Sequence, residues 1–274
     1  MKQKILISIL SFGDFVIDFS HYKAAGDDID EIFVGEHLRP IAEALCVEDE
    51  VTFINVGSDI PPKLFNFQKS SFIQIMKSFF EIRKALDAFY SHSVLYIVPH
   101  MNLRWRILMG FKNYEYVRQR LDNIYTCYEN KYTSASTNQM FGKQHDGEIV
   151  YIFPESRQVE KSLQKKDLET VTAFLKALKI KYRIVLVGEA DTCADVPEKH
   201  HITSLSELVN CVKASRFCIS VDSLPVHLAA FYNKPIFVFA ARRNDRLFPK
   251  SVLGENAWDT FGAIRKLAVW INGR

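Results

Sequence analysis

The chain has 274 residues, of which 48% are apolar and 24% are charged. This length fits one large domain or two of ordinary size, and the composition excludes a disordered chain. The formal charge of +3 is only mildly basic, and no dense Lys/Arg cluster stands beside a recognition motif. We therefore expect no nucleic-acid partner, whereas a phosphate-bearing ligand or an anionic membrane surface is compatible with this charge.

Cysteine usage and the chain start predict a cytoplasmic protein. The five cysteines are scattered, odd in number and form no CxxC pair, so neither a disulfide framework nor a zinc site is expected. The first apolar run, of about seven residues, is followed by Gly-Asp rather than by a cleavage site, which favours a buried strand over a signal peptide. No apolar run is long enough to span a membrane.

Apolar runs and helical spacing alternate through the first half of the chain. Short β-branched runs predict buried strands, and the segments between them have the apolar period of helices. We predict strands over 4–10, 32–34, 51–56 and 94–98, the last stopped by Pro99, and helices over 15–25, 38–46, 71–90 and 104–111. In the third helix, a broad apolar face is predicted, made of Phe72, Ile75, Met76, Phe79, Phe80, Ile82 and Leu86.

A second alternating series follows a polar segment, 126–147, which is rich in Ser, Thr, Asn and Gly and is interpreted as a linker. We predict strands over 148–153, 183–187, 217–221 and 235–239, and helices over 166–178, 204–215, 225–232 and 258–271. The pattern is compatible with a last helix that crosses back to the first domain. The pattern predicts an α/β chain with domains at 1–140 and 148–274, parallel sheets, and ligands at the carboxyl ends of strands in a cleft between the domains.

The strongest motif is ISVDSLPVHLAA at 219–230. A buried strand ends there and a helix begins, with Ser223 as a candidate N-cap and Pro225 in the first turn. Free N–H groups at a helix N-terminus attract phosphate, and His227 adds a donor. Asp222 would then need sugar or ribose hydroxyls, or backbone, as its partner. An ordinary cap with a core histidine explains the same residues.

Two further segments end predicted strands with polar residues. The loop Pro154-Glu155-Ser156-Arg157, with Lys161 after it, supplies hydroxyl and cationic donors for a diphosphate, or is simply a solvated loop. The segment Ser11-Phe12-Gly13-Asp14 places a carboxylate after the first strand. Asp14 is a candidate proton acceptor there, or the cap of the next helix.

Weaker signals follow two other strands. Glu189, after Gly188, is a candidate for holding a ribose or a base edge, but a turn fits equally well. The cations Arg242, Arg243 and Arg246 could meet phosphates or an anionic acceptor, or form a solvated surface. No P-loop, G-x-S-x-G or metalloprotease motif is present.

Taken in order, four segments resemble the bacterial ADP-heptose:lipopolysaccharide heptosyltransferases of glycosyltransferase family 9. They are KILISILSFGDFVID, YIFPESRQVEKSLQKKDL, YRIVLVGE and FCISVDSLPVHLAAFYNKPIFVFA. A fifth segment, ILMGFKNYEY, resembles the family less closely. The resemblance implies a GT-B fold, that is, two Rossmann-like domains with parallel sheets facing across a cleft. It also implies inverting, metal-independent transfer of heptose or another hexose-like sugar from a nucleotide-diphospho-sugar.

The resemblance also implies roles for individual residues of this chain. The resemblance implies that Asp14 is the general base, that Ser156 contacts phosphate and that the remaining donor positions include Lys161, Asp222, Ser223 and His227. Leu224, also at the donor site, replaces a glycine that lets backbone approach the donor; Glu155 adds a carboxylate, and Leu163 stands in place of a tryptophan.

These departures leave alternatives open. A catalytically weak nucleotide- or glycan-binding assembly factor is one, and a nucleotide-sugar epimerase of the same architecture is another. The resemblance implies no cofactor or metal; the partners are an ADP-sugar or other nucleotide-sugar donor and a glycan or lipid-linked acceptor such as lipopolysaccharide core or capsule. We expect a cytoplasmic protein. Arg104, Trp105 and Arg106 are candidates for peripheral contact at the inner face of the inner membrane, and a buried helix explains these residues equally well.

Overall fold

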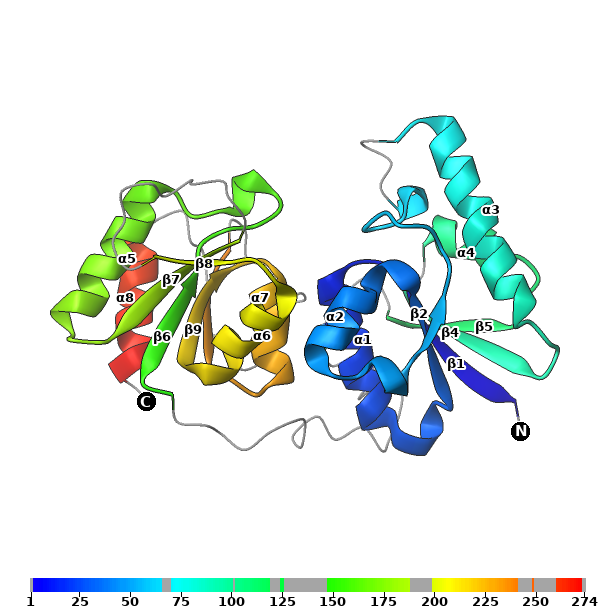
Figure 1. Ribbon diagram of the computed structural model, residues 1–274, viewed down its shortest axis with the longest axis horizontal. Coiled ribbons are helices and arrows are strands. Elements are labelled where there is room, and N and C mark those ends of the chain that lie inside the picture. The colour runs from blue at the N-terminus through cyan, green and yellow to red at the C-terminus, as the bar shows by residue number, and fades with distance from the viewer. Residues whose placement is uncertain are drawn as a thin grey trace. The chain divides into compact units, whose positions relative to one another are not determined.

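The computed structural model describes residues 2–65, 70–100, 102–118, 124–125, 147–187, 199–240, 248 and 260–272. The chain divides into two compact units, Met1–Gln139 and Met140–Arg274. Each contains a five-stranded sheet in which all pairs are parallel (Figure 1). The predicted α/β class with two parallel sheets is therefore confirmed.

In the first unit the strands lie in the order β3-β2-β1-β4-β5. Their bounds are β1 Gln3–Ser8, β2 Glu31–Gly35, β3 Thr52–Ile54, β4 Val94–His100 and β5 Tyr114–Arg118. The chain runs outward from β1 through β2 to β3, then returns to the other side of β1 with β4. This reversal between β1 and β4 is a topological switch point, where parallel sheets open a crevice at their carboxyl ends.

Helices cover both faces of this sheet. The four longer ones are α1 Phe12–Ala25, α2 Arg39–Leu45, α3 Phe72–Ala88 and α4 Leu103–Met109. α3 and α4 lie side by side and share one core with the sheet, in which Ile82, Leu86, Trp105 and Leu108 are buried (Figure 1). Right-handed crossovers place α1 and α2 on the opposite face. β4 does not stop at Pro99 as predicted, because pairing with β5 continues to His100.

In the second unit the order is β10-β9-β6-β7-β8. The strands are β6 Ile149–Phe153, β7 Tyr182–Val187, β8 Lys199–Ile202, β9 Ser215–Val221 and β10 Ile236–Phe239. The switch point here lies between β6 and β9. Phe153 and Val221, the last residues of these two strands, are both buried, so the loops that follow them start from fixed positions.

The helices of this unit are α5 Lys165–Ala177, α6 Leu205–Ala214, α7 Leu224–Phe231 and α8 Thr260–Asn272. α5 and α8 share one core, to which α5 contributes Leu168, Val171 and Leu175. The last helix, expected to cross back, contributes Leu267 and Trp270 to that core, and Trp270 meets Phe217 of β9 edge-to-face. α8 is therefore part of the second unit's packing.

Three predicted features lie partly or wholly outside the described residues. They are the polar linker at 126–147, of which only Gly147 is described, the pair Gly188 and Glu189, and the cations Arg242, Arg243 and Arg246.

Candidate functional site

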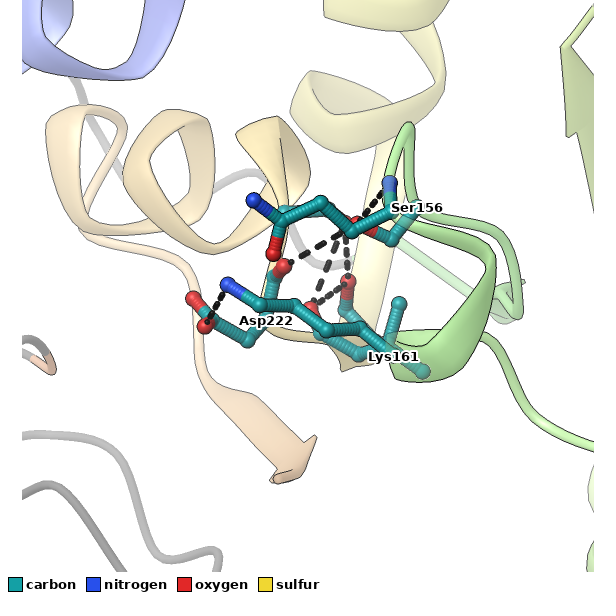
Figure 2. Close-up of polar contacts among 7 residues, drawn as sticks. Ser156, Lys161 and Asp222 are labelled. Carbon is teal, nitrogen blue, oxygen red and sulfur yellow. Dashed lines mark hydrogen bonds and ion pairs between the residues drawn. The ribbon is translucent and has the colours of Figure 1, made fainter. Parts of the chain in front are cut away.

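The candidate site lies at the switch point of the second unit, where two loops meet at the carboxyl ends of β6 and β9. The loop after β6 carries Ser156 and Lys161, and the connection from β9 to α7 carries Asp222 and Ser223. Figure 2 shows Ser156, Lys161 and Asp222 gathered there. The structure thus brings together three residues that the sequence singled out in two separate segments.

An ion pair joins the two loops. Nζ of Lys161 donates to Oδ2 of Asp222 over 2.7 Å, and both side chains are partly buried (Figure 2). The sequence predicted hydroxyl or backbone partners for Asp222, and the structure gives it a cation. An ammonium has three N–H donors, so Lys161 keeps two for another acceptor while Asp222 holds it in place.

Ser156 fixes the shape of the first loop. Its backbone N–H donates to Oγ of Ser162 (2.9 Å), and its own hydroxyl accepts from the N–H of Gln158 (3.3 Å) and donates to the carbonyl of Asp222 (3.5 Å). Ser162 was not identified from the sequence. The one sequence feature that could have identified it is its position as a hydroxyl residue next to Lys161. Leu163 is buried in the core and donates its N–H to the carbonyl of Pro154 (2.8 Å), which closes the loop.

Glu155 faces a neighbouring strand. Its Oε2 accepts the backbone N–H of Val187, the last residue of β7, over 3.0 Å. This bond satisfies a backbone donor at a strand end, where the ladder no longer supplies an acceptor. The carboxylate that replaces a small residue of the family pattern therefore has a structural partner.

The start of α7 follows directly after the ion pair. Ser223 is the N-cap residue, with extended backbone, but its side chain makes no capping bond; the hydroxyl donates to the carbonyl of Val221 over 3.3 Å. Leu224, half-buried, is the first helical residue, and His227 lies in the first turn, also half-buried. The N-terminal N–H groups of α7 are thus left without a Ser223 side-chain cap, which suits an anion.

Asp14 belongs to the first unit and lies in the first turn of α1. The predicted helix start at residue 15 is wrong by three residues, because Ser11 caps the helix and Gly13 is helical. Ser11 and Asp14 bond reciprocally: Oγ of Ser11 donates to Oδ2 of Asp14 (2.5 Å) and accepts from the N–H of Asp14 (3.4 Å). The side chain of Asp14 is partly exposed at the carboxyl end of β1, beside the first unit's switch point.

His37 was missed by the sequence analysis and lies near the same sheet edge. Its Nε2 lies 3.3 Å from the carbonyl of Leu10, the residue before Ser11, and burial lowers the pKa of its ring. A neutral ring with a proton on Nε2 can donate to this carbonyl. A side chain at Gly35 would place its Cβ 2.4 Å from this ring, so glycine at the end of β2 makes room for it. A glycine at a strand end, two residues before a histidine, is the sequence feature that could have identified His37.

Among the described residues, no group of three or more His, Cys, Asp or Glu side chains is placed to hold a metal ion. Within the same part of the chain, no helix is both long and apolar enough to cross a bilayer.

Solved structures resemble the chain over nearly its whole length. E. coli heptosyltransferase WaaC with ADP-2-deoxy-2-fluoro heptose has a TM-score of 0.64 at 15% identity, and the match covers 99% of each chain. A glycosyltransferase family 9 structure from Veillonella parvula has a TM-score of 0.63 at 15% identity, covering 98% of this chain and 90% of that one. No protein-family model and no curated protein matches the chain.

A third match is to another class of enzyme. A putative UDP-N-acetylglucosamine 2-epimerase from Listeria monocytogenes has a TM-score of 0.56 at 12% identity, covering 98% of this chain and 88% of that one. Together these matches establish the fold. The chain has the two-sheet α/β architecture of the GT-B glycosyltransferases, as expected from the sequence.

Proposed function

We propose that the chain is a glycosyltransferase that moves heptose or another hexose-like sugar from a nucleotide-diphospho-sugar to a glycan or lipid-linked acceptor. The observation that carries this is the Lys161–Asp222 ion pair at the switch point, directly before the N-terminus of α7. Loops at this point of a parallel sheet bind phosphate-bearing ligands in many folds. Support comes from the resemblance of the whole chain to a heptosyltransferase that was solved with a fluorinated ADP-heptose.

In this proposal the donor's diphosphate lies at the start of α7. The helix N-terminus, Lys161, Ser156 and His227 meet it with N–H and O–H donors, and Asp222 keeps Lys161 in position. As the bond from the anomeric carbon to the diphosphate breaks, negative charge grows on the departing phosphate. Donors that are already oriented stabilise this charge more in the transition state than in the bound donor, which speeds the reaction.

Asp14 acts as the general base of this reaction. It accepts the proton of the acceptor hydroxyl as that oxygen attacks the anomeric carbon from the face opposite the diphosphate, so the product has inverted configuration. The hydrogen bond from Ser11 holds the carboxylate in one orientation, and Oδ2 is the atom so engaged. Oδ1 is the atom that we assign to the proton transfer. We propose that no metal takes part.

The acceptor, the location and the remaining donor contacts are also proposals. A lipopolysaccharide core or capsule glycan is the acceptor class that we propose, at the cytoplasmic side of the inner membrane. Glu189 is proposed to hold the ribose or base of the donor, and Ser223 and Leu224 to line the phosphates.

A second candidate is a donor-binding assembly factor without turnover. Leu224 favours it, because its side chain stands at the first position of α7, where the diphosphate would approach closely. Glu155 does not favour the assembly factor, because its carboxylate accepts a hydrogen bond from the N–H of Val187. If Leu224 limits the approach, Leu224→Gly tightens ADP binding in calorimetry. The third candidate, an epimerase, is favoured by the Listeria match.

One set of measurements separates the three. Calorimetry with a panel of ADP- and UDP-sugars measures donor binding, and mass spectrometry of mixtures with and without glycan acceptors detects products. Transfer that requires an acceptor supports the glycosyltransferase. Isomerised sugar nucleotide without acceptor would replace it with the epimerase, and tight binding with no product would leave the assembly factor.

A further inference from the structure

The outer face of α3 and α4 exposes large apolar side chains. Of the eleven large hydrophobic residues that are exposed among the described residues, eight lie between positions 72 and 116. Phe111, directly after α4, is completely exposed. Single exposed apolar residues are normal on a protein surface, but a concentration of this kind marks a contact surface.

Helical spacing arranges these residues in two rows. On α3, Ile73, Lys77, Phe80 and Lys84 recur at intervals of four, three and four, so they share one stripe. On α4, the exposed residues Leu103, Arg106 and Ile107 form the second row, which Phe111 extends. α3 and α4 pack side by side (Figure 1), and their opposite sides bury Ile82, Leu86, Trp105 and Leu108 in the core. We call these eight exposed residues the α3–α4 outer face.

The burial of Trp105 changes which residues can meet a membrane. Trp105 has no exposed surface, and its ring lies against that of Phe65 in a tilted arrangement, so it cannot make the membrane contact. Arg104 donates to the carbonyl of Phe65 and braces the helix. The exposed aromatic residues of the α3–α4 outer face are instead Phe80 and Phe111, and Arg106 is its exposed cation on α4.

The positive charge of the region around α3 and α4 favours an anionic partner. Residues 72–118 contain seven Lys or Arg and three Asp or Glu, a net charge of +4, whereas the whole chain carries +3. Asp87, the acid nearest the end of α3, is already paired with Lys112 and Arg83. On the α3–α4 outer face, Lys77 pairs with Glu81 over 3.8 Å, whereas no carboxylate among the described residues pairs with Lys84 or Arg106. Apolar side chains interleaved with cations suit the interface of an anionic bilayer.

We propose that the α3–α4 outer face docks the protein on an anionic lipid surface. Phe80, Ile107 and Phe111 enter the boundary between headgroups and acyl chains, while Lys77, Lys84 and Arg106 meet lipid phosphates and carry their own apolar stems into the interface. This docking needs neither donor nor acceptor, so it goes beyond the proposed function and is tested apart from it.

The test is flotation of the full chain with phosphatidylcholine vesicles that contain or lack phosphatidylglycerol. The parent chain should bind the anionic vesicles preferentially and lose that binding as salt rises. Phe111→Ser or Ile107→Ser should weaken binding about tenfold, and Lys84→Gln about fivefold. These side chains are exposed, so melting temperatures should stay unchanged.

Matched controls lie in the second unit. Val269 is exposed to a similar extent as Ile107 (68% against 54%), and Lys166 is an exposed lysine on α5. Val269→Ser and Lys166→Gln should bind vesicles as the parent does. Docking by this face is overturned if the parent ignores anionic vesicles or if the controls lose binding as the α3–α4 variants do. A dimer in light scattering that Phe111→Ser dissociates would assign the face to a second copy.

Discussion

Nζ of Lys161 lies 2.7 Å from Oδ2 of Asp222, although the two residues are 61 positions apart in the chain. Each comes from a loop that follows one of the two strands at the second unit's switch point. The pair therefore ties the geometry of one loop to that of the other, and both to the start of α7.

Removing the cation should impair use of the donor. We expect Lys161→Ala to lower kcat/KM for the sugar donor by about 10² to 10³, because a preoriented donor to the leaving phosphate is lost. Initial rates with the donor identified by mass spectrometry provide the measurement. Lys166→Ala, which removes an exposed lysine of α5, is the control.

Asp222 offers a complementary test. Asp222→Asn keeps the size of the side chain but weakens its hold on Lys161, so donor affinity should fall less than in Lys161→Ala. If the Lys161→Ala variant and the Lys161→Ala/Asp222→Asn double variant lose the same donor affinity, Asp222 acts through Lys161. Full additivity would contradict that coupling.

Asp14 should matter for turnover and not for donor binding. Asp14→Asn is expected to lower kcat by about 10² or more, because the acceptor hydroxyl loses its proton acceptor, while the Kd for ADP stays the same. Asp27→Asn, at an exposed position after α1, is the matched control. Full activity of Asp14→Asn would exclude the general-base role.

Chelation should leave the reaction unaffected. We expect the same rate with EDTA as without it, because in the proposal the leaving phosphate is neutralised by Lys161 and by N–H donors of the chain. Dialysis against EDTA followed by rate measurements tests this. Loss of activity that Mg²⁺ restores would contradict metal-independent transfer.

The first unit should lose stability in acid through His21. This buried ring lies 2.9 Å from the carbonyl of Ile124 through Nε2, and burial lowers its pKa from 6.5 to about 4. Because the folded pKa is the lower one, the unfolded chain binds the proton first, and stability falls as pH drops from about 6.5 towards 4. The difference corresponds to about 3 kcal/mol.

Denaturant unfolding at several pH values measures this effect. His21→Gln should flatten the pH dependence by that amount, although it lowers stability at neutral pH. His92→Gln, at an exposed position, should leave the slope unchanged. A parent chain as stable at pH 4 as at pH 7 would rule out the assigned role.

The central strands could be predicted because they are apolar on both faces, as β1, β6 and β9 show. The edge strands β5 and β8 were missed. Their sequences, YEYVR and KHHI, are polar enough to resemble loops, and only pairing with β4 and β7 makes them strands. Local patterns do not contain that information.

The broad apolar face of α3 was only half right. Ile82 and Leu86 are buried, but Phe72 and Phe80 are exposed. Helical spacing identifies apolar positions and does not say how wide a stripe the sheet can cover. The candidate site shows the same division, since its loops follow predicted strand ends, whereas the partnerships Lys161–Asp222 and Glu155–Val187 depend on strand order.

The position of α8 has a consequence for how the protein is made. Leu267 and Trp270 complete the core of the second unit from the last residues of the chain. The core cluster that the first unit's sheet shares with α3 and α4 precedes the second unit in the chain, so it can form while synthesis continues. The sheet that carries Lys161 and Asp222 lacks part of its apolar cover until α8 has been synthesised and has packed. A chain truncated near residue 260 is therefore expected to expose apolar surface of this core to chaperones and proteases.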